Sequence, residues 1–280
     1  MAPYRYNFFL VTFPKPFIAV VEINRPARLN AFLRAMWLEL KEVFESLSYD
    51  PDVRVVILIA AGERAFSVGL DVQAAESEGG ILHKEVDGDV ARKAVGIRKT
   101  VREIQGCLNA IENCQKPVIC VLHGISYGFA VDIAVCCDIR LCSADVKFSV
   151  KEVDIGLAAD LGSLNRLPKI VGDFGWVKDV CMTARTFGAE EALQVGFARS
   201  VKETKSEAIS ESYRMARYIS CKSPVAVQGT KALLNYSRDH HLADSLEYTG
   251  VWNSAAVQTS DVSKALLSGI QKRTPTFEKL

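Results

Sequence analysis

The sequence lacks the motifs that mark several large enzyme classes. It contains no G-x-G-x-x-G, no G-x-x-x-x-G-K-[ST], no H-E-x-x-H and no EF-hand loop. The sequence therefore does not carry the usual motifs of nucleotide-dependent redox enzymes, phosphoryl-transfer enzymes or zinc hydrolases. Histidine is scarce, and no pair has ligand spacing with a third ligand nearby, so surface or structural roles are favoured over metal binding. The four histidines are His83, His123, His240 and His241.

Excess charge of one sign and long apolar runs are also missing. Lysine and arginine number 34 against 33 aspartates and glutamates, which leaves no net field to attract nucleic acid or an anionic membrane. The longest apolar runs, 17–21 and 55–61, fall far short of the ~20 residues that a membrane span requires. With 280 residues, 49% of them hydrophobic, we expect a globular enzyme or binding protein.

Cysteine is present without its usual pairing pattern. None of the eight cysteines forms a C-x-x-C, and several lie in apolar strand-like or helix-like segments. This pattern predicts buried free thiols in a reducing, intracellular compartment rather than disulfides or zinc sites. The cysteines are Cys107, Cys114, Cys120, Cys136, Cys137, Cys142, Cys181 and Cys221.

The first 200 residues show a strand–helix alternation. A nearly all-apolar segment at 53–60 predicts a strand covered by helices on both faces. Alternation of this kind predicts an α/β architecture. Further predicted strands are 6–13 and 17–24 (a hairpin around residues 14–16), 117–122, 139–142 and 146–150, and predicted helices are 31–48, a long helix ending near Cys114, and 129–137.

The last 80 residues change character. Residues 207–221, 224–238 and 242–272 have helical patterns with no convincing strand between them. We therefore expect two regions: an α/β core with the active site over residues 1–200, and a helical region over 201–280 that serves assembly or covers a pocket.

One short motif suggests a hydrolase. Gly124-Ile-Ser126-Tyr-Gly128 is a G-x-S-x-G between a predicted buried strand and an apolar helix, the context of a nucleophile elbow. Asp173 or Asp179 with His240 or His241 would complete the Ser-acid-His order. The fold would need more strands after residue 150, where the chain is mainly helical, so a simple glycine turn is the favoured interpretation.

Three acidic residues form a second candidate site. Asp132 is flanked by Ala130, Val131, Ile133, Ala134 and Val135, and a carboxylate in such surroundings is costly unless it is paired, protonated or functional. Glu152 follows a predicted strand, and Asp160 stands where it could cap a helix beginning near Leu161. Taken singly, each residue has an ordinary structural explanation.

Two loop–helix turns accompany these acids. Segments 63–71 and 124–129 each follow a predicted buried strand and precede a helix. Such turns present backbone N–H groups that stabilise negative charge. Two N–H donors together can form an oxyanion hole for a thioester enolate.

These residues resemble the crotonase (enoyl-CoA hydratase/isomerase) superfamily over nearly the whole chain. The matching segments are 23–32, 53–72, 116–150 and 161–172. Within the superfamily, residues 151–168 look like the delta(3,5)-delta(2,4)-dienoyl-CoA isomerases, whose Asp-Glu-Asp triplet is matched by Asp132, Glu152 and Asp160. Enoyl-CoA hydratases instead carry two glutamates and a glycine there, so the resemblance favours an isomerase.

The resemblance implies a fold and an assembly. It implies a spiral of ββα turns with C-terminal helices that pack in a homotrimer or a hexamer. Residues 278–280, Glu-Lys-Leu, resemble the S-K-L peroxisomal address, and no mitochondrial presequence is evident. We therefore expect a peroxisomal protein, with the mitochondrion or cytoplasm as alternatives.

The resemblance also implies a reaction. A 3,5-dienoyl-CoA would become a 2,4-dienoyl-CoA by proton transfer from C2 to C6, with Glu152 serving C2 and Asp160 serving C6, or the reverse. Asp132 would tune the pocket, and no metal or redox cofactor would be needed. The alternatives are an enoyl-CoA hydratase or delta(3)-delta(2)-enoyl-CoA isomerase, a serine hydrolase using Ser126, and a scaffold without turnover.

The substrate-binding residues follow from the same resemblance. The N–H groups of Leu70 and Phe129 would form the oxyanion hole, and CoA would contact the 25–30 turn and the 67–72 loop. Residues 73–92 would border the acyl pocket. The implied substrate-binding residues are Arg28, Ser67, Val68, Gly69, Leu70, Asp71, Gly128 and Phe129.

Overall fold

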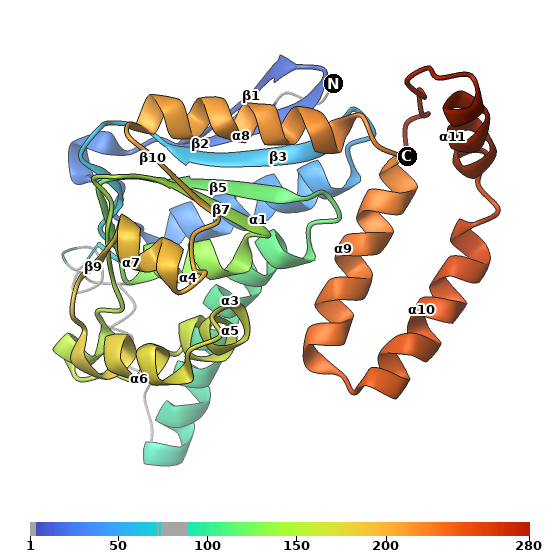
Figure 1. The fold of residues 1–280 in the computed structure, drawn as a ribbon. Helices are drawn as coiled ribbons and strands as arrows, with labels where there is room; N and C mark the ends of the chain where they lie inside the picture. Colours follow the sequence, from blue (N-terminus) through green and yellow to red (C-terminus); the bar gives the residue numbers. More distant parts are fainter. Residues whose placement is uncertain (1–3, 72, 74–88) are drawn as a thin grey trace.

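The computed structural model describes residues 4–71, 73 and 89–280, and its strands form two sheets (Figure 1). The larger sheet has the order β1-β2-β3-β5-β7-β10, with β1 antiparallel to β2 and the remaining neighbours parallel. Its strands are β1 (Phe9–Lys15), β2 (Phe17–Ile23), β3 (Val53–Ala60), β5 (Val118–Leu122), β7 (Ile139–Ser143) and β10 (Ser200–Lys202). The smaller sheet contains β4 (Ala65–Ser67), β6 (Ile125–Tyr127), β8 (Lys147–Ser149) and β9 (Phe187–Gly188).

Successive strands alternate between the two sheets. The pairs β3–β4, β5–β6 and β7–β8 each place one strand in the larger sheet and the next in the smaller one. Among the described helices, α3 (Val90–Asn113) follows the first pair and α4 (Phe129–Cys136) follows the second. This ββα repeat confirms the predicted crotonase-type spiral.

Helices cover both faces of the larger sheet. Helices α1 (Arg34–Tyr49), α3 and α4 lie on one face, and α8 (Lys205–Ser220) crosses the other (Figure 1). Beneath α8, Ala208 and Ala216 pack on apolar side chains of β2, β3, β5 and β7. The double cover explains why every residue of β3 except Arg54 is apolar, the pattern from which the sequence predicted this cover.

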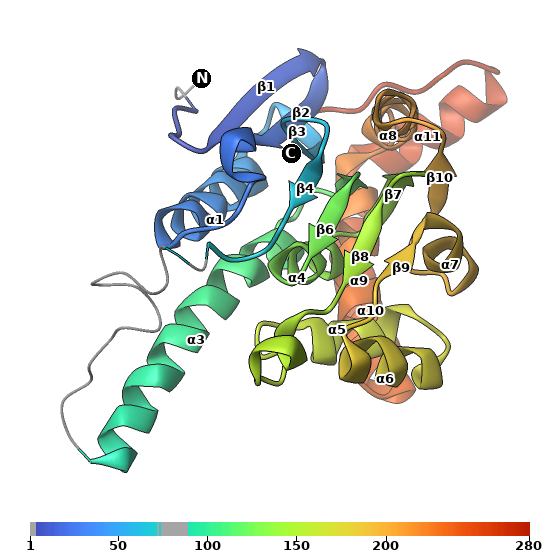
Figure 2. The ribbon, with the colours of Figure 1, turned by 90° about the vertical axis from the view of Figure 1, so that its left-hand side faces the viewer.

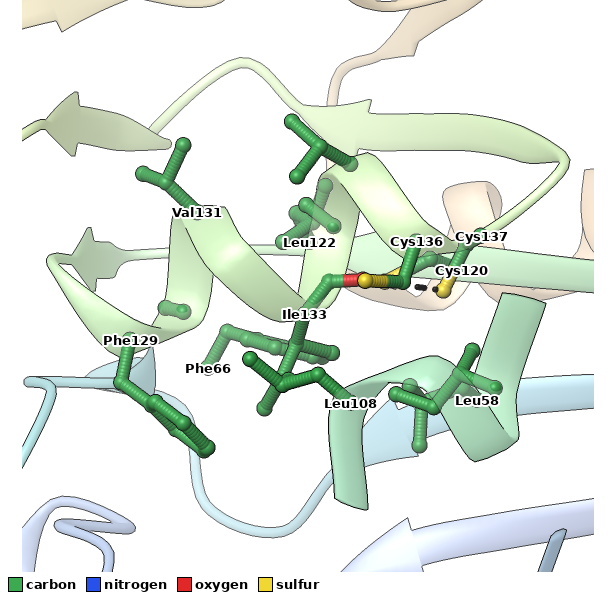
Figure 3. Close-up of a cluster of buried hydrophobic side chains, with 14 of the residues drawn as sticks. Leu58, Phe66, Leu108, Cys120, Leu122, Phe129, Val131, Ile133, Cys136 and Cys137 are labelled. Carbon is green, nitrogen blue, oxygen red and sulfur yellow. Dashed lines mark hydrogen bonds between the residues drawn. The ribbon is translucent and has the colours of Figure 1, made fainter. Parts of the chain in front are cut away.

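The centre of the core surrounds α4. Figure 3 shows Phe129, Val131 and Ile133 of α4 among buried side chains from the neighbouring strands and α3. All eight residues of α4 are buried, so this short helix is held by packing on every side. Its N-terminus, which follows the G-x-S-x-G segment, is therefore fixed relative to both sheets.

The C-terminal helices lie beside this core (Figure 1). They are α9 (Pro224–Asp239), α10 (Leu242–Ala256) and α11 (Ser260–Ile270), so the predicted helical stretch 242–272 is divided at Val257–Thr259. The predicted boundary at residue 200/201 falls inside β10, which pairs with β7. By packing, both β10 and α8 belong with the α/β core.

Between residues 150 and 205 the structure contains several short elements, of which the sequence predicted only the first helix, placed near Leu161. The helices are α5 (Ser163–Ile170), α6 (Phe174–Thr183) and α7 (Ala189–Gln194), and the strands are β9 and β10. Strands of two or three residues carry too little periodicity to be recognised. Figure 2 shows α5 and α6 below the smaller sheet, with α3 extending past them.

No helix in the described part of the chain is long and apolar enough to cross a bilayer.

Candidate active site

Two turns meet at the N-terminus of α4. A Cβ atom on Gly69 would lie 3.1 Å from the carbonyl oxygen of Tyr127 and 3.7 Å from the backbone nitrogen of Phe129. The absence of a side chain at Gly69 therefore allows the turn after β4 to approach the turn after β6. The N–H of Phe129 lies in the first turn of α4, where no intrahelical acceptor is available. The residues predicted to form the oxyanion hole, Leu70 and Phe129, thus lie on adjoining turns.

Gly128 sets the direction of the Phe129 N–H. Its φ of 52° and ψ of −114° lie outside the regions open to residues with a side chain. Its N–H donates to the Ser149 carbonyl at 2.9 Å, which ties the turn to β8. The ring of Phe129 is buried, and its centroid lies 4.8 Å from that of the Phe32 ring, so the phenylalanine is packed within the core.

The side chain of Asn30 holds the 25–30 turn. Asn30 is fully buried and has a φ of 55°. Its Nδ2 donates to the carbonyls of Ala61 and Ala65, and its Oδ1 accepts from the Arg25 N–H. Asn30 was predicted only as part of the 25–30 turn that would contact CoA, without this structural role. The signal for it was an asparagine at the end of a turn, since asparagine tolerates positive φ better than most residues.

Two predicted substrate-binding side chains are engaged within the protein. Ser67 Oγ donates to the Asn30 carbonyl at 2.7 Å and accepts from the Gly69 N–H at 3.1 Å. Asp71 Oδ2 forms a 2.7 Å ion pair with Arg25 Nη1, and both side chains are largely buried. These contacts join the 25–30 turn to the 67–71 loop. The N–H of Val68 adds a bond to the Leu29 carbonyl, whereas Arg28 is exposed at the end of a 3-10 turn.

Asp132 is the most buried of the three candidate acids. It has no exposed surface, and its Oδ1 accepts bonds from the N–H of Ser163 at 2.9 Å and from Ser163 Oγ at 2.6 Å. Its Oδ2 has no hydrogen-bond partner among the described residues. The pKa of Asp132 is raised to about 7, mainly by burial. The charges of Glu152 and Asp160 contribute to the rise, and the hydrogen bonds from Ser163 oppose it.

Glu152 lies next to the oxyanion turn. It begins the 3-10 helix η2 (Glu152–Ile155), and its Oε1 is 3.7 Å from the position that a Cβ on Gly128 would occupy. Its Oε2 is buried without a partner in the described part of the chain. Burial raises the pKa of Glu152, and the charge of Asp160 adds to the rise. A carboxylate with a raised pKa and an unbonded oxygen is suited to accept a proton near neutral pH.

Asp160 is exposed and lies in the segment that joins η2 to α5. Its charge raises the pKa of both Asp132 and Glu152, so the three acids predicted from the sequence form one electrostatic cluster. The expectation that Asp160 caps a helix beginning near Leu161 is wrong. Helix α5 begins at Ser163, and the carboxylate that binds its first N–H comes from Asp132.

Cys181 also lies near this cluster. Burial raises its pKa to about 11, and the charges of Glu152 and Asp132 contribute to the rise. All eight cysteines are free and seven of them are buried, in agreement with the predicted buried free thiols. No group of histidine, cysteine and acidic side chains suited to a metal ion occurs in residues 4–71, 73 and 89–280. His83 and most of the predicted acyl-pocket segment 73–92 lie outside the described residues.

The G-x-S-x-G segment does not form a hydrolase site. Ser126 is buried within β6, and its Oγ donates to the carbonyl of His123 rather than to an imidazole. The candidate acid Asp173 caps α6 by accepting from the Trp176 N–H, and Asp179 pairs with Arg185. The candidate bases lie elsewhere: His240 stacks on Tyr236, and His241 precedes α10. The serine-hydrolase hypothesis is therefore wrong.

Comparison with known proteins agrees with this geometry. A family model described as enoyl-CoA hydratase/isomerase matches residues 15–279. A Mus musculus protein named mitochondrial delta(3,5)-delta(2,4)-dienoyl-CoA isomerase is 40% identical over 283 residues, which cover 100% of this chain and 85% of the relative. An Arabidopsis thaliana protein with the same name and the description peroxisomal is 40% identical over 259 residues, or 92% of this chain and 91% of the relative.

Solved structures share the fold. The crystal structure of an enoyl-CoA hydratase from Bacillus anthracis superposes with a TM-score of 0.85 at 23% identity, covering 97% of this chain and 99% of that one. At this identity the likeness concerns the backbone arrangement alone.

Proposed function

Since the chain belongs to the enoyl-CoA hydratase/isomerase family, we propose that it is a delta(3,5)-delta(2,4)-dienoyl-CoA isomerase. The observation that carries the proposal is the clustering of Asp132, Glu152 and Asp160 beside the N-terminus of α4. The chain is also 40% identical to each of the two relatives of this name described above. The substrate would be a 3,5-dienoyl-CoA and the product its conjugated 2,4 isomer.

The first step removes a proton from C2. The thioester carbonyl acidifies this position, and the N–H groups of Leu70 and Phe129 would hold the oxygen on which negative charge develops. Glu152 is the proposed base, because its carboxylate adjoins the turn that carries Phe129 and its pKa is raised. The electron pair of the C2–H bond enters the conjugated dienolate.

The second step delivers a proton to C6. The double bonds shift to positions 2 and 4 as the dienolate oxygen returns to a carbonyl, so the reaction is balanced without any oxidant or reductant. C2 and C6 lie about 5 Å apart in an extended chain, a distance that favours two separate acid/base groups. We assign Asp160 to C6 and a tuning role to Asp132. We propose that the reaction needs no cofactor, since CoA is part of the substrate.

An absorbance assay tests the proposal. Purified protein mixed with 3,5-octadienoyl-CoA should produce the ultraviolet absorbance of the 2,4-dienoyl product, and treatment with a chelator should leave the rate unchanged. Crotonyl-CoA serves as the control substrate, because a hydratase would add water to it. Hydration of crotonyl-CoA with no conversion of the dienoyl substrate would overturn the proposal.

We further propose a trimer or hexamer built through the C-terminal helices. Several large apolar side chains of α10 and α11 are exposed, an arrangement typical of surfaces buried by assembly. They are Leu242, Leu246, Val251, Leu266, Leu267 and Ile270. Light scattering should give a mass three or six times 30.8 kDa, and a Leu266→Glu, Ile270→Glu double variant should give a smaller mass.

For the compartment, the named relatives are mitochondrial or peroxisomal. We propose a peroxisomal location, because residues 278–280 resemble the S-K-L address. A fluorescent protein fused to the N-terminus should give a punctate signal that becomes diffuse when Lys279 and Leu280 are deleted. A mitochondrial pattern would contradict the proposal.

A further inference from the structure

Asp160 is held by a single side chain from another element. It lies between η2 and α5, outside any helix or strand. In the described part of the chain, Asp160 takes part in one hydrogen bond, which Gln105 Nε2 of α3 donates to its backbone carbonyl at 2.6 Å. The position of this acid therefore depends on a residue 55 positions away in the sequence.

Both ends of the loop around Asp160 are fixed independently of Gln105. Upstream, the N–H of Leu157 donates to the Glu152 carbonyl at 3.0 Å. Downstream, Ser163 is bound to Asp132. The hydrogen bond from Gln105 meets this loop near its middle, at Asp160. Loss of that bond would therefore free Asp160 without releasing the two ends of the loop.

The downstream anchor is reinforced from the same face of α3. Arg166 of α5 donates to Asn109 Oδ1 at 2.5 Å and to Glu112 Oε2 at 2.8 and 3.0 Å. Gln105, Asn109 and Glu112 follow the i, i+4, i+7 spacing of one helix face. Arg166 and Glu112 are largely buried, and despite the burial the Arg166 contacts lower the pKa of Glu112. One face of α3 therefore supports the whole segment that carries Asp160.

We infer that Gln105 is a positioning residue that sets Asp160 for proton transfer at C6. The inference rests on the proposed isomerase function. Gln105 acts through the backbone of Asp160 and leaves the Glu152 side, with its own 3-10 helix, unchanged. Displacement of a reacting group by about 1 Å can cost roughly 10²-fold in rate, so the effect should appear at C6 and not at C2.

Replacement of Gln105 by methionine tests this role. Gln105→Met keeps the length of the side chain and removes the donor. We expect kcat for 3,5-octadienoyl-CoA to fall at least about 10-fold, KM to change less than about threefold, and exchange of deuterium from D₂O into C2 to persist. The matched control is Gln258→Met, because Gln258 is exposed on the distant helical region and its side chain donates to the nearby Ser254 carbonyl. This control should behave as the wild type does.

A double variant separates positioning from general loss of structure. If Gln105 acts through Asp160, then Gln105→Met should have little further effect in an Asp160→Asn background. Multiplicative losses in the double variant, parallel loss of C2 exchange, or unchanged kcat in Gln105→Met would each overturn the inference. Absence of dienoyl-CoA turnover by the wild-type protein would instead overturn the proposed function, and this inference with it.

Discussion

The side chain of Asp132 in α4 binds the first turn of α5 through both the N–H and the hydroxyl of Ser163. The two residues are 31 positions apart, so a carboxylate from one helix serves as the cap of another. Capping groups normally come from the residue directly before the helix, and here that residue is Gly162, which has no side chain to offer. The contact joins the oxyanion helix to the segment that carries Asp160.

Removal of the Ser163 hydroxyl should destabilise the protein. Ser163→Ala deletes one of the two bonds to a fully buried carboxyl group, and a lost buried hydrogen bond typically costs about 1–3 kcal/mol. Urea unfolding at pH 7 measures the loss. Ser210→Ala is the matched control, since Ser210 is exposed and bonds within α8. The control should stay within about 0.5 kcal/mol of the wild type. Equal losses in both variants would show that the Asp132 contact contributes nothing special.

The buried Asp132 should make stability fall as the pH rises. Its pKa is raised from an ordinary value of 3.8 to about 7, so between these values the folded protein keeps a proton that the unfolded chain has released. Stability therefore decreases with rising pH across this window, by at most about 1.4 kcal/mol per pH unit for one group. Asp132→Asn removes the titration. Its free energy of unfolding relative to the wild type should improve between pH 4 and pH 7, and a difference independent of pH would contradict the assignment.

Asp160 should be required for the proton transfer at C6. Asp160→Asn keeps the size of the side chain and removes its acid/base function, so kcat should fall at least about 10² with little change in KM. We expect this variant to lose turnover but still to exchange deuterium from D₂O into C2 of the substrate. A variant that isomerises the dienoyl substrate at nearly the wild-type rate would remove Asp160 from the mechanism.

Glu152 should be required for the earlier step. Glu152→Gln leaves the backbone donors of Leu70 and Phe129 in place but removes the base beside them. Both turnover and deuterium exchange at C2 should be lost, which distinguishes this variant from Asp160→Asn. Exchange that survives in Glu152→Gln and vanishes in Asp160→Asn would reverse the two assignments.

Ser126 should be dispensable. Its hydroxyl is buried in β6, and its one hydrogen bond to the described residues is a long 3.4 Å contact with a backbone carbonyl. Ser126→Ala should retain isomerase activity within a few-fold of the wild type, whereas removal of a nucleophile costs several orders of magnitude. A serine-directed phosphonate should leave no adduct by mass spectrometry, and stoichiometric labelling at Ser126 would restore the hydrolase hypothesis.

The sequence alone determined the features that depend on local pattern or on single unusual residues. The nearly all-apolar segment at 53–60 predicted a strand covered on both faces, and the structure confirms it. Asp132 stood out because a carboxylate among apolar residues is costly in any fold. The resemblance then assigned Glu152 and Asp160 to the same site. In the structure the charges of both residues raise the pKa of Asp132, and the charge of Asp160 raises the pKa of Glu152.

The tertiary structure decided everything that depends on contacts between distant segments. The sequence could not show that Asp132 rather than Asp160 caps α5, because the choice depends on how α4 and α5 meet in space. Nor could it reveal that Asn30 ties three loops together, or that Gln105 reaches Asp160 across 55 positions. A side chain's hydrogen-bond partner is set by the packing of whole helices and strands, and the order of residues along the chain does not specify that packing locally.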